Sequence, residues 1–189
     1  MVVTSKATMK QANVRFNYHD YLQLPEDKRY EILDGELSMV PAPNIRHQRV
    51  SKRIEMALIR QVEEKGLGEI LDAPCDVLLS NENVVQPDIL FVRKERLAII
   101  GEANIPGPPD LVIEILSPHT RHKDLTIKRK IYARFGIYEY WIVDPDAATV
   151  EVLTCKESGY VTAGIYRDSD QLSSPLLPDL ALRLSEIFL

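Results

Sequence analysis

Runs of apolar residues along the chain predict a succession of β-strands. Residues 30–40 (YEILDGELSMV) hold two such runs on either side of Asp34-Gly35, a dipeptide typical of a tight hairpin turn. Further runs predict one or two strands in residues 68–80 and single strands in residues 89–92, 111–116, 138–144, 148–154 and 159–167. The last three follow one another closely and predict a C-terminal meander.

Apolar residues recur at helical spacing in two longer segments. One begins at Asn44, a residue type that favours the N-terminal cap of a helix, and ends near Gly66. The other follows the polar connection of residues 117–124 and ends near Gly136. A short helix within residues 18–24 and a helical turn within residues 176–188 are also predicted.

The order of these elements predicts an α/β domain with a mixed central β-sheet flanked by helices. We expect a mobile N-terminal tail over residues 1–15 and a single domain over residues 16–189, with an N-terminal hairpin and a C-terminal β-meander. A composition of 45% hydrophobic and 27% charged residues is ordinary for a globular domain.

The sequence lacks the usual signals for export or membrane insertion. No apolar run approaches the ~20 residues of a membrane span, and residues 1–17 contain no apolar segment typical of a secretory signal. We therefore expect a cytoplasmic protein without membrane association, in which Cys75 and Cys155 are reduced thiols.

The formal net charge of −5 argues against a protein that coats nucleic acid nonspecifically. Basic residues are nevertheless concentrated in two segments predicted to be helical, residues 46–60 and 121–134. A local basic surface of this kind is compatible with an enzyme that acts on nucleic acid, although basic residues on helices are usually only solvated surface. The candidates for phosphate contacts are Arg49, Lys52, Arg53, Lys123, Arg129 and Lys130.

A lysine occupies the apolar side of the second long helix. Lys128 falls on the same helical face as Leu125, Ile131, Tyr132 and Phe135, the face that should pack on the sheet. Because lysine is almost never fully buried without a partner, an acidic group is expected beside it.

Glu114 interrupts the otherwise apolar strand of residues 111–116 and can supply that acid. A carboxylate on a strand covered on both faces needs a counter-charge or a bound cation. One interpretation is a structural ion pair between Glu114 and Lys128. The other adds a second acid and a metal ion.

Asp88 immediately precedes residues 89–92 and belongs to one of four Pro-Asp dipeptides. Acids on two neighbouring strands can bind Mg²⁺, which prefers oxygen ligands. A lysine beside such a metal can orient or help to deprotonate an attacking water and can stabilise charge in the transition state. Asp88 is the preferred partner of Glu114 because it brings a second strand to the site. Asp110 is the alternative, since it shares a strand face with Glu114.

The order of Pro87-Asp88 and Glu114, each beside an apolar strand, resembles the PD-(D/E)XK nuclease superfamily. More narrowly, the segments YEILDGEL, QPDILFV, PPDLVIEILSP and DLTIKRKIYARFGIYEYWIVDP are similar to the Uma-type restriction endonuclease family within that superfamily. The similarity extends over about residues 18–155 and is most distinctive between Glu114 and Trp141.

This resemblance implies a restriction-endonuclease-like core and an endonuclease that depends on Mg²⁺, with Mn²⁺ as a substitute. It implies that Asp88, Glu114 and the backbone carbonyl of Ile115 bind the metal. The superfamily motif places its lysine two residues after the glutamate, where this chain has Leu116. In the Uma-type family the lysine comes from the following helix, which implies Lys128 as the catalytic lysine. The helical-face argument leads to the same residue independently.

Four further residues match the family or lie near its motif. Glu31 precedes the Asp-Gly hairpin and is interpreted either as a metal or water ligand or as an exposed strand residue. His47 is interpreted either as a residue that reaches the site or contacts a phosphate, or as a hydrogen-bonded core residue. Asp124 either caps the helix or pairs with Lys128. Tyr132 either packs or forms a hydrogen bond near the site.

The resulting hypothesis is a metal-dependent endonuclease that hydrolyses phosphodiester bonds in DNA. The alternatives are a catalytically weak or inactive nucleic-acid-binding module with the same fold, and a structural protein with a buried ion pair. A homodimer would suit cleavage of both DNA strands. Tyr138, Tyr140 and Trp141 are interpreted either as a platform for stacking bases or, preferably, as core residues.

Overall fold

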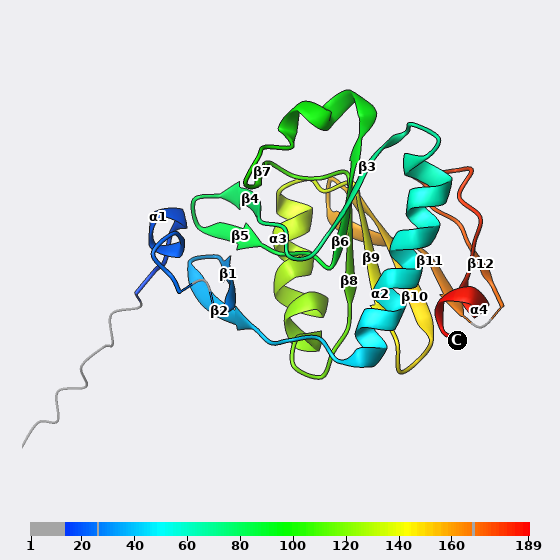
Figure 1. Cartoon of the computed structure of the whole chain (residues 1–189), viewed down its shortest axis with the longest axis horizontal. Coiled ribbons are helices and arrows are strands. Elements are labelled where there is room, and N and C mark those ends of the chain that lie inside the picture. The colour runs from blue at the N-terminus through cyan, green and yellow to red at the C-terminus, as the bar shows by residue number, and fades with distance from the viewer. Residues whose placement is uncertain (1–13, 26, 168) are drawn as a thin grey trace, which may run out of the picture.

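The computed structural model describes residues 14–25, 27–167 and 169–189, and it contains a larger and a smaller β-sheet (Figure 1). Strands of the larger sheet lie in the order β11-β10-β9-β8-β6-β3. Its strands are β3 (Gly68–Asp72), β6 (Ile89–Arg93), β8 (Leu111–Ile115), β9 (Glu139–Asp144), β10 (Thr149–Lys156) and β11 (Gly159–Arg167). Only β8 and β9 are parallel neighbours; every other neighbouring pair in this sheet is antiparallel.

The smaller sheet has the order β2-β1-β5-β4-β7. Its strands are β1 (Arg29–Leu33), β2 (Glu36–Val40), β4 (Val77–Ser80), β5 (Asn83–Val85) and β7 (Ile105–Pro106). The larger sheet confirms the predicted mixed central sheet, whereas the presence of a second sheet was not predicted. Residues 68–80 divide between the two sheets, β3 in one and β4 in the other. The segment between them contains Pro74, which cannot donate a hydrogen bond to a strand ladder.

Both predicted strand connections are confirmed. Asp34 and Gly35 adopt positive φ values of 51° and 78°, as a tight hairpin turn requires, and they join β1 to β2. Strands β9, β10 and β11 form the C-terminal meander through antiparallel pairing of consecutive strands. The parallel pair β8 and β9 is connected by the second long helix, as parallel strands require a crossover.

The first long helix begins as predicted. The Asn44 side chain accepts a hydrogen bond of 2.9 Å from the backbone N–H of His47, which caps α2 (Ile45–Leu58). The helix continues as a π-helical segment, η1 (Ile59–Glu63), and its buried residues are His47, Val50, Ile54, Leu58 and Val62. The short helix α1 (Tyr18–Tyr21) precedes the hairpin.

The second long helix contains a π-helical segment, η3 (Lys123–Lys128), followed by α3 (Arg129–Arg134). Single π turns inside helices occur often at functional sites, since they change the direction of one side chain relative to its neighbours. Lys128 is the last residue of η3 and is only 4% exposed. The prediction that this lysine faces the sheet is confirmed.

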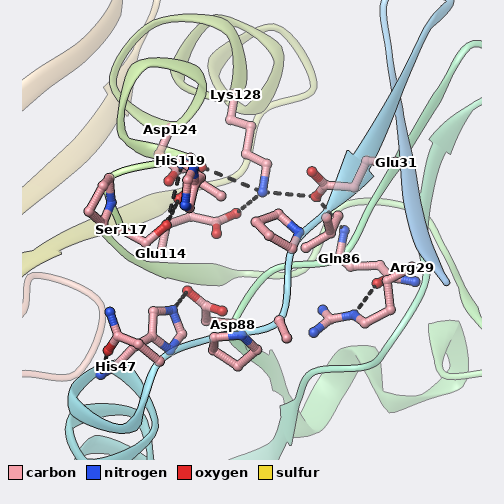
Figure 2. Close-up of a pocket in the computed structure, with 17 residues that line it drawn as sticks. Arg29, Glu31, His47, Gln86, Asp88, Glu114, Ser117, His119, Asp124 and Lys128 are labelled. Atoms are coloured by element: carbon pink, nitrogen blue, oxygen red, sulfur yellow. Dashed lines mark hydrogen bonds and ion pairs between the residues drawn. The ribbon is translucent and has the colours of Figure 1, made fainter.

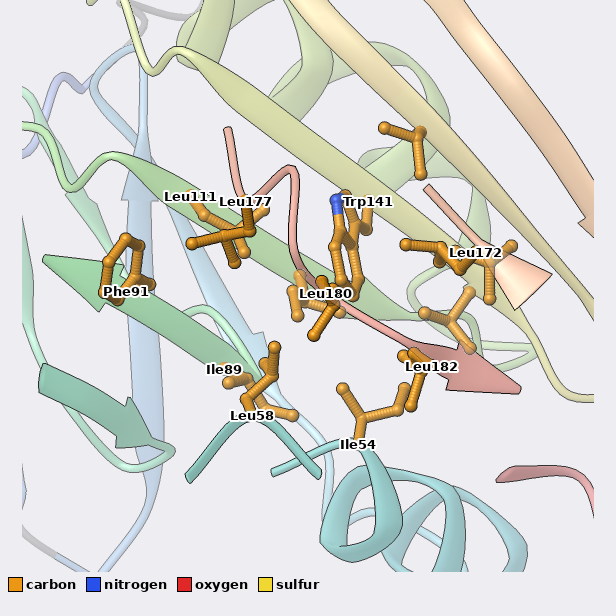
Figure 3. Packing of buried hydrophobic residues seen from close by; sticks show 14 of the residues in the cluster. Ile54, Leu58, Ile89, Phe91, Leu111, Trp141, Leu172, Leu177, Leu180 and Leu182 are labelled. Atoms are coloured by element: carbon orange, nitrogen blue, oxygen red, sulfur yellow. The ribbon is translucent and has the colours of Figure 1, made fainter. Parts of the chain in front are cut away.

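The larger sheet is covered on both faces, with α2 and α3 on opposite sides (Figure 1). Successive side chains of a strand point to opposite faces, so Phe91 joins one apolar cluster and Leu90 the other. The cluster under α2 also contains residues of the C-terminal segment (Figure 3). This segment forms the short strands β12 (Gln171–Leu172) and β13 (Leu182–Arg183). It ends in α4 (Leu184–Ile187), the predicted last helical turn. The cluster under α3 joins the larger sheet to the smaller one through residues such as Val77 and Val85.

Three further predictions concern the ends and the surface of the fold. Residues 1–13 of the predicted mobile tail lie outside the described residues, and Arg15 forms an ion pair of 2.7 Å with Glu82. Cys75 and Cys155 form no disulfide. Within the described ranges of the chain, no helix has the length and apolar character needed to cross a membrane.

Candidate active site

A pocket of about 230 Å³ opens where the smaller sheet approaches the end of β8 and the start of α2 (Figure 2). Four carboxylates line it, contributed by Glu31, Asp88, Glu114 and Asp124. The cations of its lining are Arg29 and Lys128, and two histidines, His47 and His119, complete its ionisable groups. These groups come from several separate segments of the chain, so the pocket exists only in the folded protein.

Lys128 lies at the centre of the acidic group. Its Nζ atom is 2.8 Å from Glu31 Oε1, 2.9 Å from Glu114 Oε1 and 3.6 Å from Asp124 Oδ1. Burial lowers the pKa of Lys128, but attraction by Glu114, Glu31 and Asp124 outweighs it and holds the pKa well above its ordinary value. The ammonium group is therefore firmly protonated at neutral pH.

Glu114 is 3% exposed and lies on the central strand β8. Burial raises its pKa well above the usual range; Lys128 opposes this effect, while the neighbouring carboxylates of Asp124, Asp88 and Glu31 reinforce it. Both side-chain hydrogen bonds of Glu114 within the described chain go to Oε1, from Lys128 Nζ (2.9 Å) and from the Tyr132 hydroxyl (2.6 Å). The Oε2 atom is left to bind another group.

Asp88 immediately precedes β6 and lies beside the end of β8. The antiparallel register places Ile89 opposite Ile113, which brings the Asp88 carboxylate to the backbone of Ile115. Asp88 Oδ2 accepts a hydrogen bond of 2.7 Å from the Ile115 N–H and lies 3.0 Å from His47 Nε2. The neighbouring-strand arrangement predicted for Asp88 and Glu114 is thus present. The predicted metal contact from the Ile115 carbonyl stays a prediction.

Asp110, the alternative to Asp88, does not line the pocket. Its carboxylate pairs with Arg96 at 2.8 Å and with Arg93 at 3.7 Å, and it accepts a hydrogen bond from the Arg93 N–H. The reason is the antiparallel direction of β6 and β8: Asp110 precedes β8 and therefore lies near the end of β6, whereas Asp88 precedes β6 and lies near the end of β8.

Glu31 is 3% exposed, so its interpretation as an exposed strand residue is wrong. The hairpin strand β1 carries it to the ammonium of Lys128, and its Oε1 also accepts a hydrogen bond of 2.9 Å from the Gln86 N–H. Asp124 pairs with Lys128 rather than capping the helix. Among the described residues, its buried Oδ1 atom has no hydrogen-bond partner.

Arg29 and Gln86 are among the pocket residues that were not predicted from the sequence. Arg29 lies two residues before Glu31, and this spacing places both side chains on one face of a strand. Gln86 is a polar residue between an apolar pair and Pro87-Asp88. Both patterns can be seen in the sequence, but they indicate site residues only once Glu31 is known to face the pocket.

Two of the three aromatic residues around the start of β9, Tyr140 and Trp141, are core residues. Trp141 and Tyr140 are fully buried, and the Trp141 indole N–H donates a hydrogen bond of 2.6 Å to Glu139 Oε1. They cannot stack on bases, whereas Tyr138 is 37% exposed. Of the six basic candidates, Arg53 is engaged by the C-terminal carbonyls of residues 187 and 189, and Lys52 lines a hollow that adjoins the pocket.

The chemistry of the pocket suits a hard cation. Its four carboxylates exceed its two permanent cations, Arg29 and Lys128, so a divalent ion would neutralise the remaining charge. Across the part of the chain that the structure describes, no three His, Cys, Asp or Glu side chains group closely enough to form a metal-binding cage. Mg²⁺ does not need one, because it commonly takes one or two carboxylates and keeps several waters. The second oxygens of Asp88 and Glu114 fit that requirement.

These features define a class of α/β protein in which a two-sheet fold carries an acidic pocket around a buried lysine. The profile of the Uma2 family, described as putative restriction endonuclease, matches residues 18–185. The chain therefore belongs to the Uma2 family.

Its fold is similar to the crystal structure of a putative nuclease belonging to DUF820 from Anabaena variabilis ATCC 29413. The TM-score is 0.77 at 20% sequence identity, covering 92% of this chain and 97% of the other. At that identity the similarity establishes the fold alone. No curated protein matches the chain.

Proposed function

We propose that this protein is a metal-dependent endonuclease that hydrolyses phosphodiester bonds in DNA. The observation that carries the proposal is the convergence of Asp88, Glu114 and Lys128 in one pocket, each from a separate element and with Glu31 and Asp124 around the lysine. A purely structural ion pair would need one acid for one lysine. Three acids at the lysine, with a fourth nearby, leave negative charge that a bound cation would balance.

Asp88 and Glu114 would hold the metal, each through the carboxylate oxygen that is not already hydrogen-bonded. Bound there, Mg²⁺ or Mn²⁺ would supply Lewis acidity and would neutralise charge on the phosphate. The Ile115 N–H and His47 fix the orientation of Asp88, and Tyr132 fixes that of Glu114. Such outer partners hold ligand carboxylates in place.

Lys128 contributes as a permanent cation. In the metal-free protein the neighbouring carboxylates of Glu114, Glu31 and Asp124 hold its pKa well above the ordinary value, so the amine carries a proton there. Its role is therefore to orient the attacking water and to stabilise negative charge that develops on the phosphate oxygens. This argument favours charge stabilisation over general-base catalysis for this lysine.

The proposal is tested by nicking of a supercoiled plasmid in Mg²⁺, in Mn²⁺ and in EDTA. Asp88→Asn keeps an oxygen that can accept the Ile115 hydrogen bond, and it should reduce metal-dependent nicking by more than about tenfold. Asp179→Asn is the matched control, since Asp179 also follows a proline but is exposed and outside the pocket. Equal nicking by the wild type and both variants would assign the activity to a contaminant and refute the proposal.

One observation favours the alternative, a nucleic-acid-binding module with little catalysis. One carboxylate oxygen of Asp88 and one of Glu114 are already engaged by protein groups, and Lys128 is enclosed by three acids. Calorimetry separates the two functions. Absence of Mg²⁺ and Mn²⁺ binding, together with steeply salt-dependent DNA binding, would favour the module.

A further inference from the structure

We propose that Arg29 anchors a nucleic-acid phosphate adjacent to the one that is cut, and that Gln86 holds the Arg29 guanidinium in position. This inference rests on the proposed function, because it names the part of the site that binds the substrate backbone. It concerns residues on the side of the pocket opposite Lys128 (Figure 2).

Gln86 is a rigid support for Arg29. Its Oε1 atom accepts a hydrogen bond of 2.8 Å from Arg29 Nε. Its Nε2 atom donates to Asp76 Oδ1 at 2.7 Å and to the Tyr21 hydroxyl at 3.1 Å. Because an ionised carboxylate only accepts hydrogen bonds, Asp76 fixes which end of the Gln86 amide faces Arg29.

Arg29 differs from the other cation of the pocket in having no acidic partner among the residues that the structure describes. Lys128 contacts three carboxylates, whereas no carboxylate of the described residues lies within ion-pair distance of Arg29. Only Nε is used in the bond to Gln86, which leaves the two terminal nitrogens with their N–H groups. A guanidinium held in this way presents a planar fork that matches two oxygens of a phosphate.

The position of Arg29 indicates which phosphate it would bind. The pocket adjoins a second hollow of about 220 Å³, and the two share Arg29, Pro43, His47 and Asp88 in their linings. The second hollow extends along α2, where its lining includes Lys52 together with the acidic residues Glu55 and Asp72, so Arg29 and Lys52 are its only cations among the lining residues. A nucleic-acid strand that places one phosphate at Asp88 and Glu114 would continue past Arg29 into this hollow.

The acidic composition of the pocket makes such an anchor necessary. Four carboxylates repel a polyanion, and Lys128 is already neutralised by its neighbours. Arg29 lies outside that group and pairs with no carboxylate of the described chain, so it restores attraction for the backbone at the point where the strand leaves the metal site.

The test measures binding of a short fluorescent DNA duplex by anisotropy at several salt concentrations, in Ca²⁺ to provide a hard cation. Arg29→Met removes the charge but keeps an extended side chain, and Arg29→Lys keeps the charge without the fork. Gln86→Leu removes the support while leaving the charge. Arg60→Met is the matched control, since Arg60 is exposed on η1 and lines neither hollow.

One phosphate contact corresponds to a change of about 0.9 in the slope of log K against log salt concentration, or roughly eightfold in affinity at 0.1 M salt. We expect Arg29→Met to show this loss and Arg60→Met to show none. Arg29→Lys and Gln86→Leu should keep the slope but bind more weakly than the wild type. A structural role for Arg29 would change the melting temperature without changing the slope.

Plasmid nicking by the same variants separates this inference from the proposed function. A wild type that binds DNA through Arg29 but cuts nothing would support the anchor and refute the nuclease. A wild type that cuts, with Arg29→Met equal to Arg60→Met in slope, would overturn the anchor and leave the nuclease standing. Unchanged binding by Gln86→Leu would overturn the positioning role of Gln86. No measurable DNA binding by the wild type would overturn the inference.

Discussion

Replacement of Lys128 by methionine tests the electrostatics of the pocket directly. Methionine keeps most of the side-chain length but removes the cation from Glu31, Glu114 and Asp124, all at most 4% exposed in their side chains. Removing one partner from a buried ion pair typically costs about 3–5 kcal/mol. Because domains of this kind are stable by only about 5–15 kcal/mol, Lys128→Met should lie close to unfolding at neutral pH.

The loss should also depend on pH. Lys128 is the group that lowers the pKa of Glu114, so its removal raises that pKa further above the unfolded value. A carboxyl with a raised folded-state pKa stabilises the fold below its unfolded pKa, and this contribution is lost as pH rises through the folded pKa. Lys128→Met should therefore be least stable near pH 8. As the pH falls, its free energy of unfolding should rise by up to about 1.4 kcal/mol per pH unit for each proton that the folded protein binds in excess of the unfolded one.

Urea unfolding in EDTA between about pH 5 and pH 8 measures this effect. The pH range begins at about 5 because an unfolded glutamate is protonated only below its usual pKa, slightly above 4. Lys130→Met, an exposed lysine two residues further along the same helix, is the control and should unfold like the wild type at every pH. The electrostatic reasoning is refuted if Lys128→Met matches Lys130→Met in stability. It is equally refuted if the loss at Lys128 is the same across the pH range.

Two other expectations concern Glu114. Tyr132→Phe removes the 2.6 Å hydrogen bond to its Oε1 atom and should destabilise the protein by about 1.5–3 kcal/mol in urea unfolding; a change below about 0.5 kcal/mol would show that the bond contributes nothing. Because the pKa of Glu114 is raised, Mg²⁺ binding should displace a proton from it, so Mg²⁺ affinity should rise with pH. Calorimetry in two buffers with different ionisation enthalpies detects this proton release, and identical apparent enthalpies would contradict it.

The buried lysine illustrates what local sequence patterns can predict. Helical periodicity placed Lys128 on an apolar face, and the cost of burying an unpaired charge required an acid beside it. Glu114 is an acid within an apolar strand, so it needed a counter-charge for the same reason. Both inferences use only the period of a regular element and the hydration of a charged group, so they hold before the elements are assembled. The Asp34-Gly35 turn and the Asn44 cap were predictable for the same reason.

The partners of Lys128 beyond Glu114 needed the tertiary structure. Glu31 and Asp88 belong to segments whose distance from β8 depends on which strands pair, and the sequence did not reveal that residues 68–80 divide between two sheets. The choice between Asp88 and Asp110 rested on the antiparallel register of β6 and β8, which places the two acids at opposite ends of the strand pair. Arg29 acquired its significance from the position of Glu31 on the same strand and from its hydrogen bond to Gln86.

The sequence by itself therefore determined the two long helices and most of the strands, their buried faces and the presence of a charged group in the core, but not the short strands β5 and β7. It did so because burial of apolar surface and desolvation of charge act on each segment separately. The tertiary structure alone decided which acids surround Lys128 and which lie elsewhere. That decision depends on strand order and register, which arise from contacts between residues far apart in the chain.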